Sequence, residues 1–249
     1  MSVSGPAVAP AQPRRAELWS RRLLALVAGG AVAALAARVL LAIKVAGPED
    51  IGGLVWVTTG VHLAQQRWRP RRDGRLVWRA RVSGRYGTEP GLVAGRSAAG
   101  WVELVAGRLA GTTLAVGVIS TLPAGWDWVG VGRPVLLGAV ALGLGQVAYR
   151  EVRFTGRLAL TASGLRYGSA WYAWTEVEDA RPNSRNWRDG VWLRLDPGRL
   201  LPQVVGGRSV AVSDERLLAA IEQFRRRPEV LAVGLPVAPP EPVLRSAGG

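Results

Sequence analysis

The order of apolar and polar positions divides the chain into two parts with different periodicity. In the first part, four stretches are apolar almost without interruption, namely 23–43, 51–66, 104–122 and 129–149. A helix that crosses a bilayer needs roughly 20 apolar residues. The first, third and fourth stretches reach that length, whereas the second is shorter and by itself would also fit a re-entrant or interfacial segment. The pattern therefore predicts a membrane protein with three or four crossings.

Charge between the apolar stretches favours four crossings. The chain has 32 basic and 18 acidic residues, for a net charge of +14. The excess of Arg lies before residue 23, in 67–100 and after residue 149, whereas the links 44–50 and 123–128 carry net negative charge. Four crossings place every basic stretch on one side, and positive residues mark the cytoplasmic side. We therefore expect a multi-pass protein of the cell (inner) membrane, embedded in the lipid bilayer, with both termini cytoplasmic.

One alternative concerns the first apolar stretch. Ala34-Leu35-Ala36 follows a basic region and an apolar run, as a signal-peptidase site does. The apolar run continues through Ile43, which favours an uncleaved anchor. Cleavage would leave the orientation of the remaining three helices unchanged.

After residue 150 the pattern changes to alternating apolar and polar positions, which is typical of strands. We expect strands near 152–161, 164–168, 170–181, 190–196, 201–205 and 208–212. A helix then starts after Ser213, a good N-cap, and stops before Pro228. The predicted fold class is an α-helical transmembrane region of four helices plus a cytoplasmic all-β domain capped by a C-terminal helix.

These patterns give the following domain organisation. We expect a disordered N-terminus at 1–20, a four-helix transmembrane region at 21–149 with a basic cytoplasmic loop at 67–100, a β domain at 150–232 and a disordered tail at 233–249. Residues 71–87 (RRDGRLVWRARVSGRYG) also resemble 153–168 (RFTGRLALTASGLRYG), and each follows a predicted helical pair. A decayed duplication would explain that similarity.

The predicted β domain carries several positions of a known pattern. Thr161, Gly164 and Leu165 fit a strand that reads T-x-x-G-L, and Trp174 with Val177 fits a following W-x-x-V/I element. In these motifs the chain resembles the bacterial PH-like domains found after transmembrane helices, of the low molecular weight protein antigen 6 type. Since residues three apart face opposite sides of a regular strand, we expect a bulge or a strand end that turns Trp174 into the core.

The resemblance implies a fold more than a ligand. It implies that Gly164, Trp174 and Val177 are structural positions of a PH-like domain. Eukaryotic relatives of the fold bind phosphoinositides through basic residues in the loop between the first two strands. Here that loop, 162–164, has no basic residue, which argues against such binding.

Three groups of residues are candidates for function. A loop at 183–190 places one Trp between two Arg and could contact a partner or the membrane interface: Arg185, Trp187 and Arg188. A basic run just inside the membrane could contact anionic lipid, through Arg69, Arg71, Arg72 and Arg75. Ionisable groups within or beside the apolar stretches could form an intramembrane polar cluster, namely His62, Glu103 and Arg108.

The amino-acid composition limits the metal-binding and catalytic sites that the chain can form. The absence of Cys and the presence of one His argue against thiolate or zinc sites, and no catalytic constellation or phosphate-binding loop is found. We therefore predict no catalysis, no metal and no cofactor. Because the positive charge is explained by topology, no nucleic-acid partner is predicted. The predicted function is a protein- or lipid-interaction platform that scaffolds another membrane or cytoplasmic protein. The alternative is a small transporter or channel subunit that uses the polar cluster.

Overall fold

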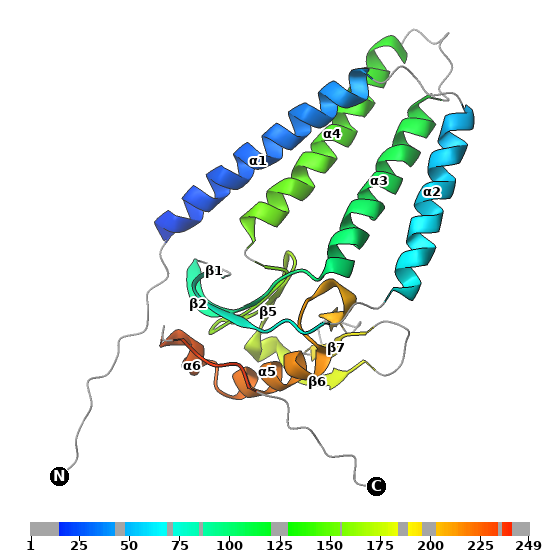
Figure 1. Ribbon diagram of the computed structural model, residues 1–249. Coiled ribbons are helices and arrows are strands. Elements are labelled where there is room, and N and C mark those ends of the chain that lie inside the picture. The colour runs from blue at the N-terminus through cyan, green and yellow to red at the C-terminus, as the bar shows by residue number, and fades with distance from the viewer. Residues whose placement is uncertain are drawn as a thin grey trace, which may run out of the picture. The chain divides into compact units, whose positions relative to one another are not determined.

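The chain forms two compact units, shown in a computed structural model (Figure 1). The helical unit comprises Ser20–Pro70 and Ala98–Arg153, and the β unit comprises Arg71–Ser97 and Phe154–Gly249 together with Met1–Trp19. The structure describes residues 15–42, 48–68, 72–84, 87–120, 129–154, 156–183, 189–195, 203–233 and 236–240.

Among the residues that the structure describes, the helical unit has four long helices, α1 (Arg15–Ala42), α2 (Pro48–Arg67), α3 (Ala98–Ser120) and α4 (Val129–Arg153). They lie side by side in the order α1-α4-α3-α2 (Figure 1). Glycines let α1 and α4 approach closely, since a Cβ at Gly29 would stand 2.8 Å from the carbonyl oxygen of Gly145. Beyond that contact, a small cluster centred on Leu40, Ile119 and Ala141 joins α1, α3 and α4.

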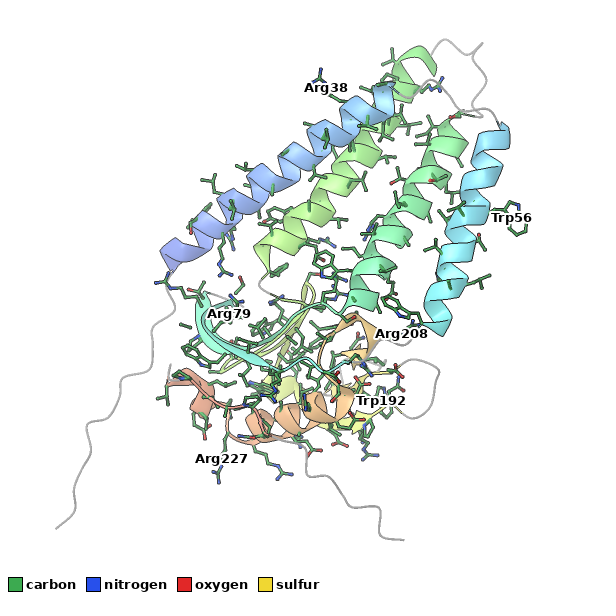
Figure 2. All side chains as sticks on the ribbon, viewed as in Figure 1. Arg38, Trp56, Arg79, Trp192, Arg208 and Arg227 are labelled. Carbon is green, nitrogen blue, oxygen red and sulfur yellow. The ribbon has the colours of Figure 1, made fainter. Side chains whose placement is uncertain are left out.

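Three of these helices are long and apolar enough to cross a membrane. They are Trp19–Ala42 in α1, Ala98–Ser120 in α3 and Val131–Arg153 in α4. The predicted crossing at 51–66 lies in α2, whose apolar part is the shorter Val55–Ala64. Large apolar side chains point outward from the helices, as Trp56 does from α2 (Figure 2). Such outward apolar surface suits a membrane-embedded protein.

In its described residues the β unit has two antiparallel sheets and two α-helices. Its elements are β1 (Val77–Ser83), β2 (Thr88–Ala94), β3 (Leu158–Thr161), β4 (Gly164–Tyr167), β5 (Ala170–Ala173), β6 (Val177–Pro182), β7 (Val191–Leu195), β8 (Gln203–Val205), α5 (Asp214–Arg226) and α6 (Glu229–Ala232). One sheet has the strand order β1-β2-β3-β4-β5, and the other has the order β6-β7-β8. The helical region and the β region predicted from sequence are thus both present.

The first two strands come from the segment that the sequence analysis assigned to a basic loop at 67–100. β2 lies between β1 and β3, with Leu92 paired to Trp78 on one side and to Leu160 on the other. Leu92 and Ala94 are fully buried in the core of the β unit. The same segment is tied to the C-terminal part at both ends, because Ala211 accepts a hydrogen bond from the N–H of Gly74 and donates one to Gly95. In the amino-acid sequence, α3 and α4 therefore lie between β2 and β3, which are neighbouring strands of one sheet.

The predicted strand at 152–161 is correspondingly shorter. Helix α4 continues to Arg153, and β3 begins only at Leu158. Val152 and Arg153 belong instead to the end of the helix, and Gly156, whose φ of 72° is in the left-handed region, lies in a bend before β3.

The long strand expected at 170–181 is interrupted. An interruption is needed because Trp174 and Val177, three residues apart, would face opposite sides of a regular strand. A 3-10 turn, Trp174–Glu176, separates β5 from β6, so Trp174 and Val177 are both buried. The indole Nε1 of Trp174 donates to the carbonyl oxygen of Thr161 at 2.8 Å, which satisfies its polar edge inside the core. The predicted strand end at Trp174 is confirmed.

The capping helix is also confirmed. Ser213 is the N-cap of α5, and its hydroxyl accepts from the N–H of Arg216. One face of the helix, with Leu217, Ile221 and Phe224, is fully buried against the strands. The helix ends at Arg226, two residues before Pro228.

Candidate functional site

The outward face of the sheet β6-β7-β8 combines aromatic, apolar and charged groups. Along β7 the burial alternates, so Val191, Leu193 and Leu195 point into the core and Trp192 and Arg194 point away from it. The register places Trp192 between Arg181 of β6 and Val204 of β8. These four outward residues, Arg181, Trp192, Arg194 and Val204, are called the β7 face below (Trp192 is labelled in Figure 2).

The two arginines of the β7 face are fixed by acidic neighbours. Arg181 Nε donates to Asp179 Oδ2 at 2.6 Å, and Arg194 Nε lies 2.9 Å from Glu178 Oε2. The hydrogen bond from Arg181 lowers the pKa of the Asp179 carboxyl, and a hydrogen bond from the N–H of Ala180 acts in the same direction. The carboxylates of Asp179 and Glu178 therefore balance the positive charges of the two arginines.

The β7 face adjoins the loop predicted to carry an interaction site. β6 and β7 form the hairpin that supports this loop, and a hydrogen bond from the N–H of Asn183 to the carbonyl of Gly190, 3.0 Å long, closes its base. Gly190 has a φ of 140°, and a Cβ there would stand 2.7 Å from Val204 Cγ1. The predicted residues Arg185, Trp187 and Arg188 lie outside the described residues.

Of the four arginines predicted to contact anionic lipid, Arg72 has another role. Its guanidinium forms two hydrogen bonds with Asp214, of 2.8 and 2.9 Å, and a longer ion pair of 3.6 Å with Asp189. The side chains of Arg72 and Asp214 are only 18% and 17% exposed. This contact ties the start of the 72–97 segment to the first residue of α5, and it removes Arg72 from the available basic surface.

The neighbouring carboxylates of Asp214 and Asp189 stabilise the charged form of Arg72. Burial by itself would lower the pKa of the Arg72 guanidinium, but the hydrogen bond to Asp214 and the charges of Asp214 and Asp189 together raise that pKa above its ordinary value. Arg75 is exposed, whereas Arg69 and Arg71 lie outside the described residues. Lipid contact by these three remains a prediction.

The predicted polar cluster is distributed over two helices. His62 belongs to α2, and Glu103 and Arg108 belong to α3. All three side chains are exposed on the helical unit, so they do not converge in its buried interior. Within the described part of the chain, no group of three or more His, Asp or Glu side chains is placed to hold a metal ion.

Gly164 lies where two neighbouring strands approach closely. Its φ is 156°, and a Cβ would collide with the carbonyl oxygen of Tyr172 on β5. The β3–β4 turn beside it is held by Glu89, whose Oε2 accepts from the Ser163 hydroxyl at 2.6 Å. Because Glu89 is on β2, this turn too depends on the inserted segment.

Sequence reasoning missed the role of β1 and β2 and the pairing of Arg72 with Asp214. The similarity between 71–87 and 153–168 pointed to the strands, since β1 and β3 occupy corresponding places in the two segments. No local pattern pointed to the ion pair, because its partners are far apart in the chain. No protein family, curated protein or solved structure matches this chain.

Proposed function

We propose that this chain is a multi-pass protein of the cell membrane whose β unit is a cytoplasmic protein-interaction platform. The observation that carries the proposal is the pairing of β2 with β3 in one sheet. A sheet forms only between strands on the same side of a bilayer, since no open strand edge is stable in lipid. The segment after α2 and the segment after α4 therefore share one side.

Because the segment after α2 and the segment after α4 lie on the same side, the chain between them crosses the membrane an even number of times. Both α3 and α4 are long and apolar enough to span, and together they leave and return to the same side. Arg is abundant in 67–100 and after residue 149, which favours the cytoplasm for that side. With α1 and α2 as a second pair, the topology has four crossings and a cytoplasmic N-terminus.

The architecture of the β unit supports the PH-like proposal. Two antiparallel sheets are followed by an amphipathic helix whose apolar face packs on the core, as the motif resemblance implies. Trp174 donates a hydrogen bond to Thr161 inside the core, and Gly164 permits the close approach of β4 and β5, which are structural roles. In this proposal the first two strands come from the segment between the helical pairs.

The β7 face favours a protein partner over anionic lipid. Trp192 and Val204 offer apolar area, and Val204 is 40% exposed. The charges of Arg181 and Arg194 are already balanced by Asp179 and Glu178. A surface with an exposed apolar residue, an aromatic residue and two arginines whose charges are already paired resembles a protein-binding patch.

Cysteine labelling tests the topology, because the chain has no Cys of its own. Arg79→Cys on β1 and Arg226→Cys on α5 are both exposed positions. We expect a membrane-impermeant maleimide to label both variants in inside-out vesicles and neither in intact cells or right-side-out vesicles. Labelling of the two positions from opposite sides would overturn the proposal.

Quantitative affinity capture from detergent extracts tests the platform. We expect a defined set of proteins to copurify with the tagged full-length chain and to be lost with Trp192→Ser plus Val204→Ser. Glu222→Gln on the exposed side of α5 is the matched control and should retain the set. An identical set from the β7-face variant and the parent would contradict this role, as would recovery of the intact protein without detergent.

A further inference from the structure

Helix α3 has two open sides in the helical unit. Because the helices lie in a row, α3 has α4 on one side and α2 on the other (Figure 1). At 3.6 residues per turn, one of its two open sides carries a line of residues spaced alternately three and four apart. This line, called the α3 seam below, consists of Leu104, Gly107, Gly111, Leu114 and Val118.

The α3 seam is accessible along most of its length. Leu104 at its start is half-buried, whereas Leu114 is 63% exposed and Val118 is 58% exposed. A Cβ added at Gly107 or Gly111 would meet no atom within 4 Å, so the space above both glycines is open. The opposite open side carries bulkier residues at the depth of these glycines, including Leu109. The glycine side is therefore the one that permits close approach of another helix.

Two charged side chains flank the seam and make a lipid-facing position unfavourable. Glu103 and Arg108 are both exposed on α3. The apolar stretch begins at residue 104, so Glu103 lies at its edge and Arg108 lies about 6 Å inside it at 1.5 Å per residue. Glu103 and Arg108 are five positions apart, whereas neighbours on one helix are three or four apart, so α3 does not bring them together. Charged groups in or beside a spanning segment commonly pair with groups of opposite charge.

The five-residue spacing identifies the partner that would neutralise both charges. When seam residues occupy positions a and d of a heptad, Glu103 is at a g position and Arg108 is at the next e position. In a parallel pair of helices, a g residue faces the e residue five positions later on the other helix. Two copies of α3 in the same membrane are parallel, and their symmetric contact would form two Glu103–Arg108 ion pairs.

We propose that this chain forms a homodimer in the membrane through the α3 seam, with Glu103 of each copy paired to Arg108 of the other. The charges of one helix complement those of an identical helix at the same depth. A partner of another kind would need an acid and a base at the same two depths. The inference rests on the proposed membrane topology of α3.

Cross-linking in native membranes tests the dimer in the full-length chain. Leu114→Cys places a reporter on the seam, and Leu109→Cys places the matched control on the opposite open side. Under mild oxidation we expect a disulfide-linked dimer from Leu114→Cys and only monomer from Leu109→Cys. Equal cross-linking at both positions, or none at Leu114→Cys, would overturn the proposed interface.

Charge reversal tests the ion pairs in the Leu114→Cys background. Either Glu103→Arg or Arg108→Glu places like charges opposite each other, and we expect the dimer fraction to fall about tenfold or more. The double reversal Glu103→Arg plus Arg108→Glu restores opposite charges in the homodimer and should restore the dimer. If the double variant is integrated in the membrane but stays monomeric, the pairing is wrong.

Membrane integration separates this proposal from the topology on which it rests. Resistance to alkaline extraction is measured on the same samples, with Glu103→Gln and Arg108→Gln as milder variants that insert more readily. Extraction of the parent chain by alkali would contradict the proposed topology itself. An integrated parent chain that fails to cross-link at Leu114→Cys contradicts only the dimer.

Discussion

Arg157 donates its backbone N–H to the carbonyl oxygen of Ala94 at 2.9 Å, although the whole of α3 and α4 lies between them in the chain. This hydrogen bond extends the ladder in which Ala94 pairs with Leu158 at the end of β2 and the start of β3. The chain therefore leaves the β unit before α3 and re-enters it after α4 at neighbouring points of one sheet.

The first prediction is that the β unit folds without its inserted helices. Residues 72–97 joined to 156–240 by a short Gly/Ser linker should give a monomer with a cooperative thermal transition and a near-UV signal from its buried Trp174. Residues 154–240 alone should aggregate or remain unfolded, because the edge of β3 would be uncovered and Leu92 and Ala94 would be missing from the core. Circular dichroism and size-exclusion chromatography distinguish these outcomes. Cooperative folding of 154–240 by itself would show that β1 and β2 are dispensable.

The second prediction concerns the Arg72–Asp214 ion pair. Arg72→Met leaves a largely buried carboxylate without its strongest partner and should lower the free energy of unfolding by about 1–3 kcal/mol. Arg72→Lys should recover only part of this loss, because Lys cannot donate two parallel hydrogen bonds to one carboxylate. Urea unfolding of the joined β unit measures both effects.

Arg75→Met is the matched control for this pair, since Arg75 is exposed in the same segment. It should change stability by less than about 0.5 kcal/mol. Equal effects at residues 72 and 75 would mean that the ion pair with Asp214 adds no stability of its own.

The third prediction concerns the backbone at Gly164. Gly164→Ala forces a side chain into the backbone of β5, where Tyr172 lies, and should destabilise the β unit by about 1–3 kcal/mol. Gly95→Ala is the control, because a Cβ there meets no atom within 4 Å and its φ is not in the left-handed region. Thermal unfolding of both variants should show a clear loss for the first and little change for the second. A neutral Gly164→Ala would contradict the close approach of β4 and β5.

The fourth prediction is a pH dependence at Asp179. Its folded pKa is lowered, first of all by the hydrogen bond from Arg181. Because the unfolded value is about 3.9, the stabilisation is complete above that pH and disappears as the pH falls through the folded pKa. Both side chains are substantially exposed, so the effect should be only a few tenths of a kcal/mol.

Asp179→Asn isolates this contribution. The parent β unit should be slightly more stable than the variant at pH 6, and the two should unfold at the same urea concentration near pH 2. A difference that grows on acidification would have the wrong sign for a carboxylate stabilised by Arg181.

Local patterns in the sequence determined much of this protein. Long apolar stretches, together with the charge between them, predicted four spanning helices, and three of these helices are long and apolar enough to cross a membrane. That property could be predicted because it depends on length and composition within one segment. Ser213 and Pro228 predicted the bounds of α5, since helix caps are set by neighbouring residues. The spacing of Trp174 and Val177 predicted the break between β5 and β6 because alternation along a strand is also a local property.

The tertiary structure decided which segments belong together. The run 71–97 had the charge of a cytoplasmic loop, and only pairing with β3 showed that it completes the sheet and the core. Arg72 matched a lipid-facing basic run in sequence, yet the fold places it against Asp214. Strand pairing and ion pairing across the chain depend on which surfaces meet after folding, and no window of neighbouring residues contains that information.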